Sequence, residues 1–168
     1  MRPSIDLNNQ IKKYRDEYLK NNEKRINGCC GLIHYNDINE WLKIENEVRT
    51  NKLTEKNVLA DSYFLYRLLD DKIIGSIQIR HSLNEDLKSY GGHIGYSISP
   101  LERKKGYGTL MLSLVLEKAK TLGINKVLIT CDKDNIASRK IIITNGRILE
   151  NEIIFHESII QRFWITLK

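Results

Sequence analysis

Apolar side chains recur along this chain at helical spacing in four long segments and at alternate positions in several shorter ones. Spacings of three and four residues predict amphipathic helices over 7–27, 37–48, 110–122 and 136–145. The segment 110–122 is so rich in leucine that we expect its helix to be largely buried. Alternation predicts strands over 63–69, 72–80 and 93–99, of which the first two form a hairpin.

Two further segments complete the predicted β-structure. The apolar run 126–131 lacks polar alternation, which is typical of a strand buried on both faces in a parallel pair. Together with strand 93–99 and helix 110–122, this run predicts a βαβ unit. The tail, 148–167, contains two β-rich runs around His156–Ser158 and predicts a closing hairpin. The fold class that follows is α+β with a mixed sheet.

No feature of the sequence divides the chain into separate domains. Its 168 residues, 41% of them hydrophobic, suit one globular domain over 1–168. Only two prolines are present, and no Gly/Ser-rich linker or internal repeat interrupts the pattern. The amino terminus lacks the apolar run of a signal peptide, and no segment is apolar enough to cross a bilayer. We therefore expect a soluble cytoplasmic protein with no membrane partner.

Composition narrows the classes of partner. The three cysteines have no metal-ligand spacing, so we expect neither a disulfide scaffold nor a metal site. The formal net charge of +6 on its own would fit a nucleic-acid partner, with an affinity that falls steeply with salt. However, basic and acidic residues are interspersed, for example in 12–25, and a mixed solvated surface explains them better. We expect no nucleic-acid partner.

The segment Arg103–Thr109 carries the strongest chemical signal. It contains three basic residues and two glycines, and it lies between a strand that ends at Pro100 and a predicted helix. The backbone N–H groups at a helix N-terminus lack intrahelical partners and bind anions, and glycine lets an anion approach the backbone closely. The spacing matches neither a P-loop nor a dinucleotide motif, because Met111 stands where the third glycine of the latter would be.

In its context, the loop resembles the signature of the GNAT superfamily of acyl-CoA-dependent N-acyltransferases. That signature, Arg/Gln-x-x-Gly-x-Gly/Ala, is matched by Arg103, Gly106 and Gly108. The strand before it and the junction 134–138 also resemble the family, and the likeness extends over about 61–167. Segments 80–84 and 92–96 are similar to a bacterial branch of uncharacterised predicted acetyltransferases. The resemblance implies a mostly antiparallel sheet of about six to seven strands, about four helices and a βαβ unit that holds the cofactor.

The resemblance also implies which residues hold the cofactor, acetyl-CoA, with no metal. The backbone N–H groups of Lys104 to Thr109 would bind the CoA pyrophosphate, Arg103 to Lys105 would supply positive charge, and the backbone of Ile98 would bind the pantetheine arm. Asn135 and Ser138 match positions that contact the CoA arm, although Asn135 is also a good helix N-cap. The implied cofactor-binding residues are Ile98, Arg103, Lys104, Lys105, Gly106, Tyr107, Gly108, Thr109, Asn135 and Ser138. The alternative for the loop is an ordinary basic helix N-terminus.

The catalytic residues depart from the family pattern. Family members usually carry a glutamate as base on the strand before the signature, and Gly92 stands at that position. The adjacent His93 is the first candidate base, with a structural histidine as the alternative interpretation. His81 and Glu85 are further candidates. A tyrosine often protonates the leaving thiolate, but Ile142 occupies its position here, so Tyr96, or else Tyr90, is the candidate acid.

Two functions from different classes follow. The first is an N-acetyltransferase that moves an acetyl group from acetyl-CoA directly to a primary amine of a small molecule or peptide. The second is a non-catalytic acyl-CoA-binding or regulatory module, because Gly92 and Ile142 stand where the base and acid usually are. Either function is compatible with a homodimer. Trp41, on the second predicted helix, is either a wall of the acceptor cleft or a core residue.

Overall fold

The structure, a computed structural model, describes residues 1–50, 58–146 and 148–167. It is an α+β fold with four α-helices and six strands in this part of the chain. In chain order these elements are α1 (Asn8–Lys20), α2 (Ile38–Thr50), β1 (Ala60–Arg67), β2 (Lys72–Arg80), β3 (Ile94–Ile98), α3 (Tyr107–Thr121), β4 (Lys126–Asp132), α4 (Ile136–Thr144), β5 (Leu149–Phe155) and β6 (Ser158–Thr166).

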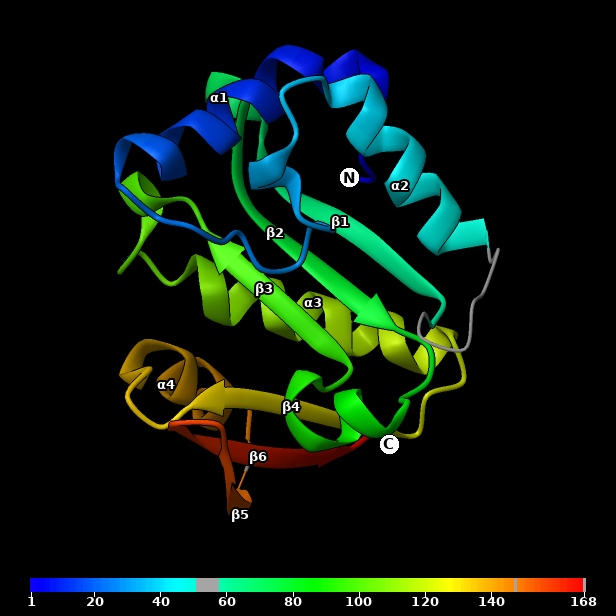
Figure 1. The fold of residues 1–168 in the computed structure, drawn as a ribbon, viewed down its shortest axis with the longest axis vertical. Helices are drawn as coiled ribbons and strands as arrows, with labels where there is room; N and C mark the ends of the chain where they lie inside the picture. Colours follow the sequence, from blue (N-terminus) through cyan, green and yellow to red (C-terminus); the bar gives the residue numbers. More distant parts are fainter. Residues whose placement is uncertain (51–57, 147, 168) are drawn as a thin grey trace.

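The first three strands form an antiparallel sheet in the order β1-β2-β3. The predicted hairpin is confirmed, and its first strand begins three residues earlier than predicted, at Ala60. Cross-strand partners share a face, so alternate rows of the sheet point to opposite sides. Buried residues of α1 and α2 pack with Phe64 and Ile73, and α3 packs with Ile77 and Ile79. In Figure 1, α1 and α2 lie above the sheet and α3 lies behind it.

The last three strands form a second antiparallel sheet in the order β4-β6-β5. The predicted closing hairpin is confirmed, with its turn at His156–Glu157. The predicted parallel partner of β4 is only partly present. β3 and β4 point the same way, but the backbone hydrogen bond between them is from the His93 N–H to the Leu128 carbonyl, at 2.8 Å, and the strands then diverge (Figure 1). The single mixed sheet expected from the sequence is therefore divided in two.

Helix α3 is less buried than its composition suggested. Met111, Leu112 and Val115 face the core, but Leu110 and Leu114 are 48% and 55% exposed. The helix therefore has an apolar outer face as well as an apolar inner one. This explains why a prediction based on composition alone overestimated its burial.

Helix α1 ends at Lys20, seven residues before the predicted end. The following residues instead form turns that descend over β2 and β3 (Figure 1). Gly28 has a φ of +80° and lies so close to the carbonyl of Gly95 that a Cβ would collide with it. The segment after α1 therefore covers the middle of β3, where the first sheet faces away from α3.

Candidate active site

The loop that joins β3 to α3 has the backbone of an anion-binding site. After Ile98 the chain makes a short 3-10 turn at Pro100–Glu102, and α3 then begins at Tyr107. Lys104 and Gly106 both have positive φ, +63° and +83°. No side chain caps α3, and no acceptor in the described residues meets the backbone N–H groups of its first three residues, Tyr107 to Thr109. These N–H groups lie at the positive end of the helix dipole and can receive a phosphate.

The two glycines of the loop have different roles. A Cβ on Gly106 would meet nothing within 4 Å, so its positive φ, not lack of space, requires glycine there. A Cβ on Gly108 would lie 2.5 Å from Cδ1 of Ile141, so Gly108 allows α3 to pack closely against α4. The open space at Gly106 is what a bound pyrophosphate would need. The loop therefore has space at Gly106 for the CoA pyrophosphate that the sequence resemblance implied.

A buried carboxylate, Glu102, anchors this loop and was missed by the sequence analysis. Glu102 is only 4% exposed, yet it accepts hydrogen bonds from Arg67 on β1, Lys72 on β2 and Lys105 in the loop, all at 3.0–3.1 Å. Arg67, followed by Lys105 and Lys72, lowers the pKa of Glu102 to about 2. Arg67 also donates to the hydroxyl of Tyr107, the first residue of α3. The loop is thus tied to the β1–β2 hairpin.

Arg103 does not point freely into solvent. Its Nε donates to the carbonyl of Ile98 at 3.1 Å, and its two terminal nitrogens lie 2.8 Å from the carboxylate of Glu23, just after α1. This ion pair raises the pKa of Arg103 and lowers that of Glu23. Of the three loop cations, Arg103 and Lys105 are therefore paired with carboxylates, whereas Lys104 is exposed without a partner in the described chain. Protein carboxylates therefore partly neutralise the charges of Arg103 and Lys105 but not that of Lys104.

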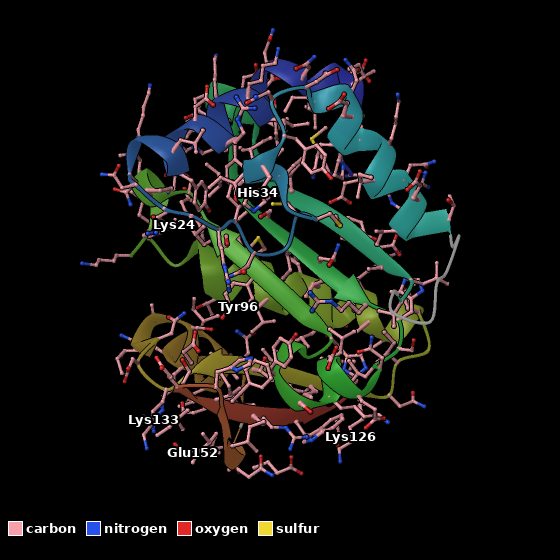
Figure 2. The ribbon with its side chains drawn as sticks, viewed as in Figure 1. Lys24, His34, Tyr96, Lys126, Lys133 and Glu152 are labelled. Atoms are coloured by element: carbon pink, nitrogen blue, oxygen red, sulfur yellow. The ribbon has the colours of Figure 1, made fainter. Side chains whose placement is uncertain are left out.

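The junction before α4 lies on the other side of the gap between the sheets. Asn135 is the N-cap of α4, and its Oδ1 accepts a hydrogen bond from the Ser138 N–H at 3.0 Å. The hydroxyl of Tyr96 on β3 lies 2.8 Å from Oγ of Ser138. Burial raises the pKa of Tyr96 to about 12. Figure 2 shows Tyr96 between β3 and α4, and the hydrogen bonds bring three of the predicted residues, Tyr96, Asn135 and Ser138, together there.

His93 lies at the closed end of the gap and is 6% exposed. Its Nδ1 accepts a hydrogen bond from the Leu128 N–H at 2.9 Å, while its own backbone N–H donates to the Leu128 carbonyl. Burial, followed by the charge of Arg80, lowers the pKa of His93 to about 4. The Nδ1 lone pair is therefore occupied, and neutral His93 carries its proton on Nε2. This geometry matches the structural interpretation that the sequence left open.

The structure explains why Gly92 has no side chain. Gly92 has φ +63° and ψ −177°, a region open essentially only to glycine, and a Cβ there would lie 2.8 Å from the Leu128 carbonyl oxygen. Ile142 is fully buried in the core shared by α3 and both sheets. Both positions that carry acid and base in the family pattern are thus used for packing.

The remaining candidates lie apart from Tyr96. His81 lies 3.0 Å from the carboxylate of the buried Asp61, and Glu85 pairs with Lys88 at the surface. Tyr90 stacks on Phe155, with ring centroids 4.0 Å apart. Trp41 is fully buried, and its Nε1 donates to the Cys29 carbonyl, so it is a core residue. Among the predicted catalytic side chains of the described residues, Tyr96 is therefore the one that contacts α4.

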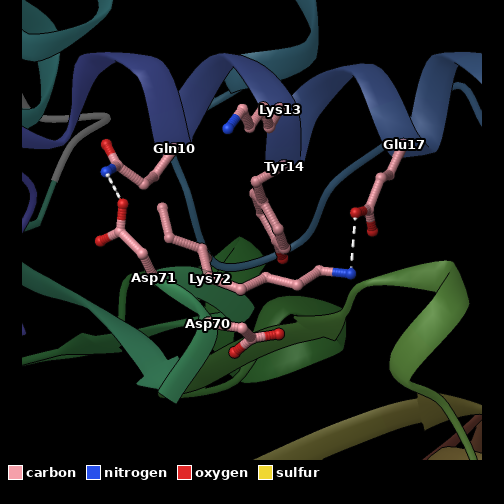
Figure 3. A pocket seen from close by; sticks show the side chains of 8 residues that line it. Gln10, Lys13, Tyr14, Glu17, Asp70, Asp71 and Lys72 are labelled. Atoms are coloured by element: carbon pink, nitrogen blue, oxygen red, sulfur yellow. Dashed lines mark hydrogen bonds and ion pairs between the residues drawn. The ribbon is translucent and has the colours of Figure 1, made fainter. Parts of the chain in front are cut away.

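A cavity of about 230 Å³ lies between α1 and the β1–β2 turn (Figure 3). Lys72 lies along it and pairs with Glu17 at 3.0 Å, and Gln10 donates to Asp71 at 2.7 Å. Its lining residues are Gln10, Lys13, Tyr14, Glu17, Asp70, Asp71, Lys72 and Ile73. None of them is a predicted site residue, although Lys72 also bonds to Glu102, which anchors the loop before α3. In the described part of the chain, no three or more His, Cys, Asp or Glu side chains group to hold a metal ion, and no helix is long and apolar enough to cross a membrane.

Comparison with known proteins identifies the class to which this geometry belongs. The family described as acetyltransferase (GNAT) domain matches residues 33–147. The chain therefore belongs to the GNAT acetyltransferase family. No curated protein sequence matches it.

Several solved structures share the fold. The microcin C7 self-immunity acetyltransferase MccE, in complex with acetyl-CoA and AMP, has a TM-score of 0.69 at 17% identity, covering 99% of this chain and 91% of that one. A mutant of the spermidine N-acetyltransferase SpeG from Vibrio cholerae has a TM-score of 0.65 at 13% identity, covering 95% and 90%. The ribosomal-protein-S5-alanine acetyltransferase from Vibrio fischeri has a TM-score of 0.59 at 16% identity, covering 76% and 69%. At these identities the likeness concerns the fold alone.

Proposed function

We propose that the protein is an N-acetyltransferase that transfers the acetyl group of acetyl-CoA directly to a primary amine. The observation that carries this proposal is the uncapped N-terminus of α3 with the open, left-handed Gly106 before it, at the end of a strand that diverges from β4. Family membership and the fold shared with MccE, whose structure contains acetyl-CoA, support it. When bound, acetyl-CoA supplies the activated thioester.

The chain's own residues would hold the cofactor at three places. Backbone N–H groups from Lys104 to Thr109 would bind the pyrophosphate, and Lys104 is the cation free to approach it. The backbone of Ile98 would bind the pantetheine arm as an added strand binds an edge. Asn135 and Ser138 would contact the arm from the α4 side.

Tyr96 is the residue that we assign as general acid. Its hydroxyl lies in the gap and stays protonated at neutral pH, because burial raises its pKa to about 12. Its hydroxyl would hydrogen-bond to the sulfur as the amine nitrogen forms its bond to the acyl carbon and the carbon–sulfur bond breaks. The proton that it passes to the thiolate would then be restored to Tyr96 by solvent. A thiolate with a conjugate pKa near 8.5 is a fair leaving group, so this donation accelerates a step that is already accessible.

The amine must lose a proton before it attacks, at a cost of roughly 4 to 5 kcal/mol at pH 7 for a pKa near 10.4. His93 is poorly suited to accept it, because its Nδ1 is bonded to Leu128 and its pKa is about 4. We assign His93 as a positioning residue that fixes the closed end of the gap. Solvent then accepts the proton from the amine.

The acceptor is an amine of a small molecule or peptide. Solved structures with this fold include enzymes named for spermidine, a small polyamine, and for the alanine of a ribosomal protein. One spermidine N-acetyltransferase from Vibrio cholerae is described as dodecameric, so self-association of this chain, expected as a homodimer, is also proposed. Light scattering of the purified protein would measure its oligomeric state.

The test of the proposed function is thiol release from acetyl-CoA in the presence of a panel of amines and peptides. Turnover with at least one amine, accompanied by a product heavier by one acetyl group, is the expected result. Tight CoA binding without turnover of any amine would contradict it and would favour the alternative, a non-catalytic acyl-CoA-binding module. That alternative is motivated by Gly92 and by Ile142, which is buried in the core.

A further inference from the structure

Arg80, the last residue of β2, is a half-buried cation that has no carboxylate partner in the described residues. Its Nη1 donates hydrogen bonds to the carbonyls of Gly91 and Gly92, at 3.1 and 3.0 Å. Its Nε and Nη2 donate to no group in the part of the chain that the structure describes, and neither nitrogen is enclosed. Burial lowers the pKa of Arg80, but a guanidinium remains charged in proteins. A partly desolvated cation is normally paired, so Arg80 is suited to an anionic ligand.

The side chains around Arg80 do not supply that anion. The titratable groups whose charges act on Arg80 are the thiol of Cys30 and the phenol of Tyr90, and neither is a carboxylate. By contrast, Arg67 and Arg103 are each paired with carboxylates of the described chain. Those two arginines hold the loop between β3 and α3 in place, whereas the open donors of Arg80 are available to a ligand.

The open side of Arg80 lies over the face of β3 that points away from α3. Figure 1 shows the end of β2 beside the start of β3. Gly95 is the cross-strand partner of Gln78, so it shares a face of the sheet with Arg80, two residues further along β2. A Cβ on Gly95 would lie 3.7 Å from Nη2 of Arg80. Tyr96, the next residue of β3, points to the opposite face and contacts α4. An acceptor that approaches a thioester beside β3 from the face of Gly95 therefore meets Arg80.

The geometry of the open donors identifies the anion as a carboxylate of the acceptor. Nε and Nη2 are an adjacent pair, and such a pair binds a carboxylate through two parallel hydrogen bonds. The CoA pyrophosphate does not fit, because its loop begins beyond Ile98, about 10 Å further along β3 than Gly95. The oxyanion of the tetrahedral intermediate does not fit either, since it forms at the edge of β3, whereas Nη2 lies over the face of the strand.

The charge of Arg80 also acts on the reacting amine. A cation nearby lowers the pKa of an amine, which makes the loss of its proton easier, but it repels the ammonium form as the acceptor arrives. A carboxylate in the same acceptor molecule offsets this repulsion by pairing with the guanidinium. An amine without a carboxylate has no such compensation.

Resting on the proposed function, we propose that Arg80 binds a carboxylate of the acceptor through Nε and Nη2, so that the acceptor is an aminocarboxylate such as a free amino acid. The amine nitrogen forms its bond to the acetyl carbon as the carbon–sulfur bond breaks, and the products are an N-acetyl aminocarboxylate and CoA. One proton passes from the amine to solvent. The carboxylate itself is unchanged, so Arg80 determines specificity and does not take part in the chemistry.

The test compares four aminocarboxylates with their carboxamides in the thiol-release assay: glycine, β-alanine, γ-aminobutyrate and ε-aminocaproate. Each carboxamide has nearly the same shape as its acid but no negative charge. Loss of that charge also lowers the pKa of the amine, so easier deprotonation cannot explain a preference for the acid. We expect kcat/KM for at least one acid to exceed that of its amide at least tenfold, mainly through KM.

Two variants separate the role of Arg80 from a general effect of charge. Arg80→Gln keeps an N–H donor but loses the cation and the paired donors, so it should bring the ratio of acid to amide to within about twofold of one. Arg49→Gln is the matched control, because Arg49 is an exposed arginine on α2 that bonds to Asn46 of its own helix. This control should keep the wild-type ratio.

Each outcome supports or overturns the carboxylate subsite. A ratio near one for all four pairs in the wild type, or a ratio that survives Arg80→Gln, would overturn it. If Arg80→Gln fails to fold, Arg80→Lys takes its place: it keeps the charge but not the two parallel donors, and the ratio should fall at least about threefold. If no amine is acetylated, the proposed function fails. Thermal shifts of the CoA complex with the same acids and amides then test the subsite separately, because only the acids should stabilise the protein, and only when Arg80 is present.

Discussion

The hydroxyl of Tyr96 and Oγ of Ser138 lie 2.8 Å apart and join β3 to the first turn of α4 across the gap between the two sheets. At the other end of β3, His93 is bonded to Leu128 of β4. The β3 segment is thus linked to β4 through the backbone and side chain of His93, and to α4 through the side chain of Tyr96. The proposed pantetheine arm, if it lies beside β3 as we propose, would approach the second link and leave the first intact.

The first prediction concerns Tyr96. Tyr96→Phe removes the proton donor but keeps the ring, so we expect kcat for acetyl transfer to fall about ten- to a hundred-fold. The Kd for CoA should change less than threefold, which isothermal titration would measure. Tyr63→Phe is the control, because Tyr63 occupies the same row of the sheet and its hydroxyl accepts a hydrogen bond from Arg2 at the surface. An unchanged kcat in Tyr96→Phe would exclude Tyr96 as the acid.

The second prediction concerns the glycine loop. Gly106→Asp places a carboxylate against the expected pyrophosphate, so the Kd for CoA should rise at least tenfold, about 1.4 kcal/mol. Gly123→Asp provides a matched control at the other end of α3, because Gly123 also has positive φ, +73°, and open space around its Cα. Both variants carry the same backbone strain, and only the first should weaken CoA binding. Equal affinity of the two variants for CoA would refute the assignment of this loop as the binding site of the CoA pyrophosphate.

The third prediction concerns Glu102. Glu102→Gln leaves Arg67, Lys72 and Lys105 without their shared carboxylate, and we expect it to lower the free energy of unfolding by about 2 kcal/mol or more. Glu117→Gln, which breaks an exposed pair with Lys120 on α3, should cost under about 0.5 kcal/mol. Urea denaturation of both variants measures the difference. A similar small loss in both would show that the buried network is not needed for stability.

The same carboxylate predicts a dependence of stability on pH. Its pKa is about 2 in the folded chain, against an ordinary value of 4.5, so the unfolded chain binds its proton first as the pH falls. The stability that it contributes is complete above pH 4.5 and is lost as the pH falls toward 2. We expect the stability difference between wild type and Glu102→Gln to shrink over this interval, measured by urea denaturation at each pH. A stability difference that stays constant between pH 4.5 and 2 would contradict this prediction.

The fourth prediction concerns His93. Because burial lowers its pKa to about 4 from an ordinary 6.5, His93 should remain neutral throughout pH 5 to 8, and its stabilising contribution should decline only as pH falls from 6.5 toward 4. An NMR titration, with the His93 resonance assigned by its absence in His93→Gln, measures this directly. A midpoint near 6.5 would show that His93 is free to act as a base.

The glycine loop could be predicted from the sequence because its signal is local. Arg103, Gly106 and Gly108 are neighbours in the chain, and glycine and helix-start chemistry depend mainly on adjacent residues. Glu102 and Arg80 could not be found in the same way, because their roles depend on contacts with distant elements. The only signal for Glu102 in the sequence was its position as an acidic residue directly before Arg103, Lys104 and Lys105.

The sheet arrangement shows a similar limit. The apolar run in β4 correctly predicted burial on both faces, since Val127, Leu128 and Ile129 are fully buried. Burial does not specify the direction of the neighbouring strand, and β4 pairs with the antiparallel β6 instead. The predicted helix α4 was confirmed, both in its extent and in its N-cap at Asn135. Capping and helical periodicity could be predicted because both depend on residues that are neighbours in the chain.

Gly92 restricts how this chain can change over time. A single nucleotide change from a glycine codon can produce glutamate, but at position 92 that side chain would meet the Leu128 carbonyl and require a positive φ. A descendant of this chain cannot therefore acquire the usual base by one mutation without moving two strands apart. Selection for faster proton removal would have to act at a different position, where the backbone has room for a side chain.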